Sequence, residues 1–164
     1  MKENKPNKQR IGFLPLIVLG IFAVFTLYCI LTPLFLHVET YCLDADISSP
    51  IRIVQLSDLH NNVFGDNNNR LMTQVAKQNP DLIFICGDML NKNDPDTDLV
   101  TALVRELSTM APVFYGYGNH EKAWEKRFGE NLAPILEEAG ATVVDGSYID
   151  LEINGNALRI GGYM

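Results

Sequence analysis

The feature that most constrains this chain is a pattern that occurs three times: a short apolar run, a polar cluster and an amphipathic segment. The three apolar runs are residues 51–56, 82–86 and 113–117. Asp58, after the first run, precedes Asp88 by 30 residues, and Asp88 precedes Asn119 by 31 residues. This spacing is close to the length of a strand, a helix and the return to the next strand. The pattern therefore predicts successive βα units in an open α/β sheet.

The segments between the runs have the spacing of amphipathic helices. Residues 71–76 place their apolar side chains on one face, and the Asn-Pro pair at residues 79–80 ends that segment. A second helix is expected to begin with Asp94 as its N-cap and Pro95 at its first helical position. A third is expected at residues 131–139, before a glycine that can cap its end.

The remainder of the chain has the pattern of strands. Residues 143–144 form a short apolar run. Residues 149–153 and 157–160 are joined by an Asn-Gly pair, which predicts a β-hairpin with a two-residue turn. Residues 38–43 are a further strand candidate.

Residues 11–36 form an uninterrupted stretch of 26 residues without a charged side chain. At about 1.5 Å per residue, a helix of that length exceeds the hydrocarbon core of a bilayer, which is about 30 Å thick. The alternative is a cleaved signal, but its apolar region would be about 7–15 residues long and would precede a small-residue cleavage site. We therefore expect an uncleaved transmembrane helix at residues 11–36, after a tail at residues 1–10 and before a juxtamembrane linker or strand at residues 37–50.

Charge predicts the orientation of this segment and excludes one class of partner. The tail at residues 1–10 has four basic side chains and one acidic side chain, and positively charged flanks stay in the cytoplasm. The rest of the chain is thus expected outside the membrane. The net charge of −7 argues against nucleic acid as a partner. Cys29, Cys42 and Cys86 lie too far apart for a disulfide framework or a zinc motif and are expected as free thiols.

Five polar residues follow the three apolar runs, namely Asp58, His60, Asp88, Asn119 and His120. In an open α/β sheet, ligands bind beyond the carboxyl ends of the strands, where side chains from separate connections converge. Each residue alone has an ordinary explanation, as a turn cap, a left-handed turn residue or a surface histidine. Together, two carboxylates, a carboxamide and two imidazoles predict a metal site. This mixed oxygen and nitrogen donor set suits Mn, Fe or Zn better than Ca.

The motifs at these positions resemble those of the calcineurin-like metallophosphoesterases. That family has DxH, GD and GNH(D/E) at its strand ends, and this chain has Asp58-Leu59-His60, Gly87-Asp88 and Gly118-Asn119-His120-Glu121 in the same order. The resemblance covers residues 51–164, and the apolar segment before them is similar to the anchor of the membrane-associated bacterial branch. It implies a two-sheet αββα sandwich with a two-metal centre at its edge. Glu121 is expected to orient its neighbours and not to bind metal.

The resemblance also implies a role for each site residue. Asp58 and His60 would bind the first divalent metal ion. Asp88 would bridge both ions, and Asn119 would bind the second. His120 would contact the substrate phosphate and protonate the leaving alkoxide. Two bridged cations lower the pKa of a shared water, so that a metal-bridging hydroxide can attack phosphorus.

The function implied is hydrolysis of a phosphodiester or pyrophosphate on the outer side of a bacterial membrane, where a lipid-linked substrate is within reach. The family also has a later metal-binding histidine and a GHxH motif, whereas this chain has only His37, His60 and His120. We therefore expect residues 51–164 to be a C-terminally incomplete domain that is weakly active or inactive by itself. The alternative is a non-catalytic, membrane-anchored binding or assembly module. A phosphatase with an aspartate nucleophile would need a second Asp at the position of His60.

Overall fold

The computed structural model describes residues 13–31 and 36–163. The chain divides after His37 into two compact units. The first contains helix α1 (Phe13–Leu31), which exposes apolar side chains along its length. Within the described residues, no helix combines the length and the hydropathy that crossing a membrane requires. The structure therefore does not support the transmembrane helix predicted at residues 11–36, of which residues 11, 12 and 32–35 lie outside the described part.

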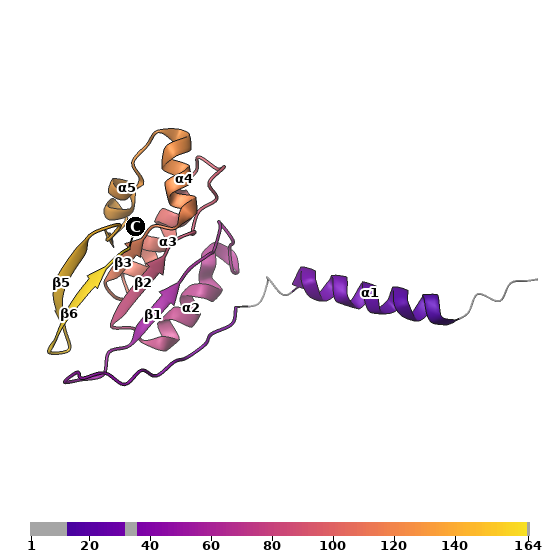
Figure 1. The fold of residues 1–164 in the computed structure, drawn as a ribbon, viewed down its shortest axis with the longest axis horizontal. Coiled ribbons are helices and arrows are strands. Elements are labelled where there is room, and N and C mark those ends of the chain that lie inside the picture. The colour runs from indigo at the N-terminus through magenta and orange to yellow at the C-terminus, as the bar shows by residue number, and fades with distance from the viewer. Residues whose placement is uncertain (1–12, 32–35, 164) are drawn as a thin grey trace, which may run out of the picture. The chain divides into compact units, whose positions relative to one another are not determined.

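The second unit begins at Val38 and, within the described residues, is built on a four-stranded parallel sheet (Figure 1). Its strands are β1 (Ile53–Leu56), β2 (Leu82–Cys86), β3 (Val113–Gly116) and β4 (Ala141–Val143), in the order β1-β2-β3-β4. All three strand pairs are parallel, with Ile53 opposite Leu82 and Ile83 opposite Val113. Because parallel neighbours need a crossover connection, a helix follows each of the first three strands. The predicted α/β fold is confirmed.

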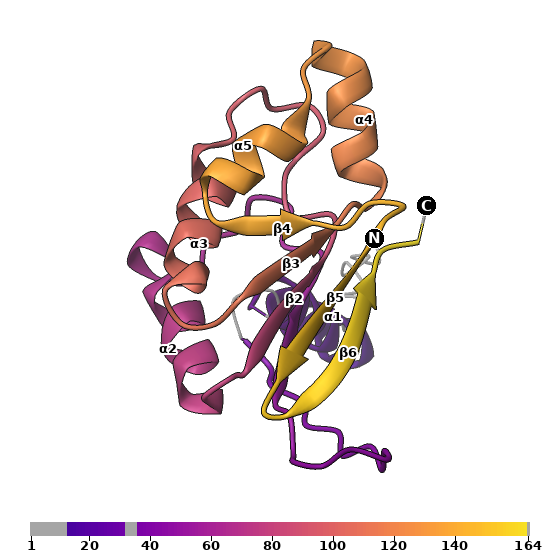
Figure 2. The same ribbon diagram turned by 90° about the vertical axis from the view of Figure 1, so that its left-hand side faces the viewer.

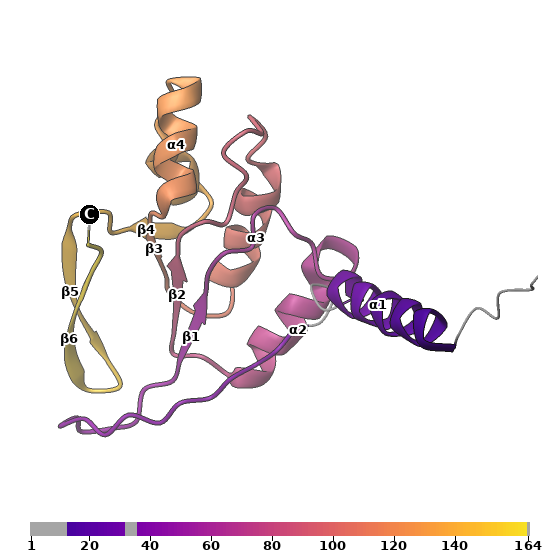
Figure 3. The same cartoon turned by 45° about the vertical axis from the view of Figure 1, so that its right-hand side comes forward.

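The helices of this unit lie mainly on one face of the sheet. They are η2 (Asp66–Asn68), α2 (Asn69–Gln78), α3 (Asp98–Ser108), α4 (Asn119–Phe128) and α5 (Leu132–Glu138). Figure 2 shows α2, α3 and α5, and Figure 3 shows α2 and α3, on the face opposite to the hairpin of β5 (Tyr148–Ile153) and β6 (Asn156–Gly161). Leu107 of α3 and Leu136 of α5 are fully buried in this layer. Helix α4 stands beyond the carboxyl ends of the strands, next to the predicted site (Figure 1).

The hairpin consists of β5 (Tyr148–Ile153) and β6 (Asn156–Gly161), as the Asn-Gly pair predicted. Asn154 and Gly155 have φ angles of 52° and 76°, the left-handed conformations that a type I′ turn requires. The hairpin covers the second face of the sheet through a buried cluster formed by Leu82, Phe114 and Val144. At its turn, the side chain of Asn156 is buried and bonds to the backbone of Ser48 and Ser49, which attaches the entering chain to the hairpin.

Two sequence predictions about secondary structure are wrong. Helix α3 begins at Asp98, not at Pro95, because the side chain of Asp94 accepts a hydrogen bond from Asp96 N and that of Asp96 accepts one from Asp98 N. These local bonds make successive turns that compete with the helix. Residues 38–43 form no strand. The expected third helix is present, and Asn131 caps it by accepting from Ala133 N at 3.1 Å.

Replacing Leu82 tests the packing between the sheet and the hairpin. Leu82 has no exposed surface, so Leu82→Ala should lower the free energy of unfolding by about 2–5 kcal/mol. Leu99→Ala is the matched control, because Leu99 is 44% exposed on α3 and should change stability by only about 0.5 kcal/mol. Urea unfolding followed by the fluorescence of Trp124, the single tryptophan, measures both. Equal losses for the two variants would contradict this packing.

Candidate metal centre

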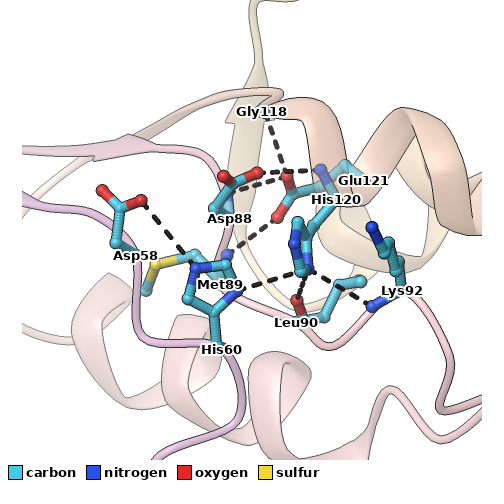
Figure 4. Close-up of polar contacts among 9 residues, drawn as sticks. All are labelled: Asp58, His60, Asp88, Met89, Leu90, Lys92, Gly118, His120 and Glu121. Atoms are coloured by element: carbon cyan, nitrogen blue, oxygen red, sulfur yellow. Dashed lines mark hydrogen bonds and ion pairs between the residues drawn. The ribbon is translucent and has the colours of Figure 1, made fainter.

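Four of the predicted site residues, Asp58, His60, Asp88 and His120, lie together at one edge of the parallel sheet (Figure 4). The fifth, Asn119, has its side-chain amide beside the carboxylate of Asp88. Asp58 and His60 follow β1, and Asp88 follows β2. Asn119 and His120 follow β3 and form the first turn of α4. The carboxyl ends of parallel strands point the same way, so the three connections meet at the same edge.

The backbone of the first two connections is held in an unusual conformation. Asp58, His60 and Asp88 have φ angles of 59°, 48° and 54°, a conformation that costs side-chain-bearing residues free energy and that clusters at functional sites as well as in turns. Three hydrogen bonds join the two connections: Asp58 N donates to Gly87 O at 3.1 Å, His60 N to Asp88 O at 3.0 Å and Asn61 N to Met89 O at 2.8 Å. These bonds offset the conformational cost and align the side chains.

Three side chains form a group that could hold a cation. His60, Asp88 and His120 each offer one ligand atom, and these atoms all lie within 4.8 Å of one another. The Nδ1 atoms of the two histidines are 3.3 Å apart. Two imidazole nitrogens bound tetrahedrally to one zinc ion at about 2.05 Å would be about 3.3 Å apart. The two ring nitrogens can share a proton, or they can share a cation when neither carries a proton.

Asn119 and Asp88 add an oxygen-rich part to the same group. One terminus of the Asn119 side-chain amide lies 3.0 and 2.6 Å from the two carboxylate oxygens of Asp88. With nitrogen in that position, the amide donates to both oxygens. With oxygen there, three oxygens face one another, an arrangement that needs a cation between them. The Asn119–Asp88 pair is therefore compatible with the site both without a cation and with one bound.

Asp58 lies at the outer rim of this group. Its Oδ1 is 3.9 Å from His60 Nε2, and the side chains of His60 and Asp58 are 37% and 67% exposed. An exposed carboxylate beside a histidine can reach a cation from the solvent side. Water and a charged substrate can reach the same edge.

His120 is oriented by the connection after β2. Its backbone N–H donates to Asp88 Oδ1 at 2.8 Å, and its Nδ1 lies 3.2 Å from Leu90 O and 3.4 Å from Lys92 N. A proton on Nδ1 can be donated to the Leu90 carbonyl, which leaves Nε2 to meet a ligand or to carry a second proton. The sequence predicted contact with substrate for His120, and the geometry also allows it to hold metal.

Behind the metal-ligand group, Glu121 is fully buried, and its carboxylate accepts a hydrogen bond from the Tyr115 hydroxyl at 2.8 Å. Burial raises the pKa of Tyr115 well above its ordinary value of 10, and the negative charge of Glu121 raises it further. The pKa of Tyr117 is raised by burial and then by Glu125, to which its hydroxyl donates at 3.1 Å.

Comparison with known proteins agrees with these motifs. The family model of the calcineurin-like phosphoesterases matches residues 51–160. The chain belongs to this family. It is also 30% identical over 115 residues to an uncharacterized metallophosphoesterase of Campylobacter jejuni. That match covers 66% of this chain and 29% of the Campylobacter protein, so the chain spans less than a third of its relative.

The structure thus brings all five predicted residues to one edge, while their individual roles stay predictions. Sequence reasoning missed the carbonyl of Leu90 and the backbone N–H of Lys92 as neighbours of His120. Backbone groups carry no sequence signal of their own, so only their position after the GD motif could have indicated them. The three cysteines are free thiols, as predicted, and all three are exposed.

Gly87 is expected to be essential at this edge because two connections approach closely there. Its φ is 75°, and a Cβ at this position would lie 2.1 Å from Gly118 N. Gly155 has nearly the same φ, 76°, but its Cβ would enter open space. Gly155→Ala should therefore lower the free energy of unfolding by only about 1–2 kcal/mol, the cost of the left-handed conformation. Gly87→Ala should lower it clearly more and should abolish metal binding. Urea unfolding and calorimetric titration with Mn²⁺ test this, and similar effects of both variants would contradict the close approach.

The buried Tyr115 should make stability depend on pH in the alkaline range. Its folded pKa lies above its unfolded value of about 10, so its contribution is complete below pH 10 and is lost as the pH rises further. Above pH 10, the free energy of unfolding should fall more steeply for the wild type than for Tyr115→Phe, by up to about 1.4 kcal/mol per pH unit. Tyr163→Phe, at a residue 97% exposed, is the control. Parallel pH profiles for the wild type and Tyr115→Phe would show the expectation to be wrong.

Proposed function

We propose that this chain takes part in metal-dependent hydrolysis of a phosphoester, with Asp58, His60, Asp88 and Asn119 as the ligands of two divalent metal ions. The observation that carries the proposal is the grouping of His60, Asp88 and His120 ligand atoms within 4.8 Å at the carboxyl edge of the sheet. Mn, Fe and Zn all suit this mixture of imidazole and carboxylate ligands. The membership of the metallophosphoesterase family supports the reaction class.

The residues of the chain supply binding, orientation and proton transfer. When bound, the two ions would provide a hydroxide nucleophile at neutral pH and would stabilise charge on the phosphoryl oxygens. Asp88 is central because its Oδ1 also accepts from His120 N and so fixes the histidine beside the ligand group. His120 can hold a proton on Nε2 while Leu90 O accepts the proton on Nδ1. The proton on Nε2 is available for the departing alkoxide.

The open edge suits a substrate with an accessible phosphate, such as a phosphodiester or pyrophosphate. Asp58 is 67% exposed beside the half-buried His60, so both can be approached from solvent. We further propose that the hairpin β5–β6 belongs to the second sheet of an αββα sandwich. The location outside a bacterial membrane and a lipid-linked substrate are proposals based on the uncharged segment and its basic flank.

Asp88→Asn tests the proposal with little change in shape. Asparagine tolerates the positive φ of residue 88, and its amide oxygen can still accept from His120 N. The variant loses only the negative charge and one acceptor. We expect metal affinity and hydrolysis to fall by at least about 100-fold, because even residues that merely support a ligand are worth about 10–100-fold. Metal analysis and hydrolysis of bis(p-nitrophenyl) phosphate with Mn²⁺ or Zn²⁺ measure both effects.

Asp96→Asn is the matched control. Asp96 is an exposed carboxylate in the connection after β2, and its Oδ1 accepts from Asp98 N. It should keep wild-type metal content and rate. Unchanged metal content in Asp88→Asn would refute the ligand set. Metal binding by the wild type without any hydrolysis would show that the chain by itself only binds metal, as an incomplete domain or a non-catalytic binding module would.

A further inference from the structure

We infer that Glu121 is a positioning residue, which holds together the two connections that carry Asp88, Asn119 and His120. The inference rests on the proposed function of the site, since it concerns how the ligands are placed. Glu121 itself is not a member of the metal-ligand group found among the described residues. Its side chain is fully buried behind that group (Figure 4).

The carboxylate of Glu121 accepts four hydrogen bonds. Asp88 N and Gly118 N donate to Oε2 at 2.8 and 2.9 Å. Met89 N and the Tyr115 hydroxyl donate to Oε1 at 2.9 and 2.8 Å. Each oxygen therefore accepts two hydrogen bonds. Those to Oε2 link the connection after β2 to the connection after β3. A buried carboxylate is costly unless it is fully hydrogen-bonded, and here these donors stabilise it.

A carboxylate is the group that this position requires. Three backbone N–H groups converge on one point, because the chain turns after β2 and α4 begins after β3. Each N–H would be buried without a partner if no acceptor were present. Glu121 is the third residue of α4 after the cap Gly118, where negative charge also interacts favourably with the helix dipole.

The bonds of Glu121 act on the ligands through the backbone. Fixing the N–H of Asp88 fixes the residue whose Oδ1 accepts from His120 N at 2.8 Å. Fixing the N–H of Gly118 fixes the residue directly before Asn119. Glu121 thus accepts a hydrogen bond from the backbone of the connection after β2, and Asp88 accepts one from the backbone of the connection after β3. Loosening one bond should let Asp88 and Asn119 move apart and weaken the grip on a cation.

Glu121→Gln tests the inference with a nearly isosteric change. If the amide nitrogen takes the place of Oε2, it faces two backbone N–H donors. If it takes the place of Oε1, it faces Met89 N–H, and the Tyr115 hydroxyl can turn and accept. The second orientation costs less, so the bond from Met89 N should be lost. The bonds from Asp88 N and Gly118 N would then go to a neutral amide oxygen and weaken, because hydrogen bonds to a charged carboxylate are about twice as strong.

Glu125→Gln is a matched control on the same helix. The Glu125 carboxylate also accepts from a tyrosine hydroxyl, that of Tyr117, and from a backbone N–H, that of Leu132 at 2.8 Å. Leu132 lies outside the two connections that carry the ligands, and Tyr117, although it follows β3, contacts Glu125 through its side-chain hydroxyl and not through its backbone. The same chemical change there loosens the contact between α4 and α5 and leaves the metal edge intact.

Two measurements on the full chain decide the matter, and neither uses hydrolysis. In the first, amide hydrogen exchange without metal should be at least about tenfold faster at Met89 in Glu121→Gln than in the wild type. In the second, calorimetric titration with Mn²⁺ should show affinity reduced by about 10–100-fold. Glu125→Gln should match the wild type at Met89 and in Mn²⁺ affinity. Far-UV circular dichroism checks that each variant is folded.

Several results would overturn the inference. Wild-type exchange at Met89 in Glu121→Gln would show that Glu121 does not hold the connections. Wild-type Mn²⁺ affinity despite faster exchange would show that it does not position ligands. If Glu125→Gln changed Met89 exchange and Mn²⁺ affinity as much as Glu121→Gln, the cause would be a general loss of stability. If the wild type bound Mn²⁺ but hydrolysed nothing, hydrolysis by this chain alone would fail while the role of Glu121 stood. If it bound no Mn²⁺, the metal-dependent function and the positioning of ligands would fail together.

Discussion

The metal edge depends on one physical constraint: the connections after β2 and β3 must approach closely enough to share hydrogen bonds. Gly87 and Gly118 permit the approach, because a Cβ on Gly118 would lie 2.2 Å from Asp88 Oδ1. Glu121 then accepts from the N–H groups of both connections, and Asp88 accepts from His120 N in return. These bonds turn two adjacent strand ends into one rigid edge, from which the predicted ligands project.

The same edge shows how an acidic site can be stable before it binds a cation. The carboxylate of Glu121 is fully buried but is surrounded by four donors, so its charge is compensated without a metal ion. The charges of Asp58 and Asp88, in contrast, face a half-open rim. A cation bound there would neutralise charge that the solvent otherwise screens. The buried carboxylate of Glu121 thus stabilises the backbone, whereas the more accessible carboxylates of Asp58 and Asp88 are available to a cation.

Much of the fold could be predicted because it depends on local patterns. The continuous apolar run of β2 indicates a strand buried on both faces, and Asn154-Gly155 specifies the turn of the hairpin. The start of α3 could not be predicted, since Asp94 and Asp96 cap either turns or a helix with the same side-chain chemistry. Nor was helix α4 predicted, because its first turn coincides with the site motif at Asn119 and His120.

For the site, the order and spacing of Asp58, Asp88 and Asn119 were enough by themselves to indicate a metal edge and a family, because parallel βα units place every strand end on the same side. Only the tertiary structure decided which atoms meet. The 3.3 Å contact between the two histidines and the four bonds to Glu121 depend on backbone groups and on close approach in space. Residue identities along the chain do not encode such distances, whereas packing of the folded sheet does.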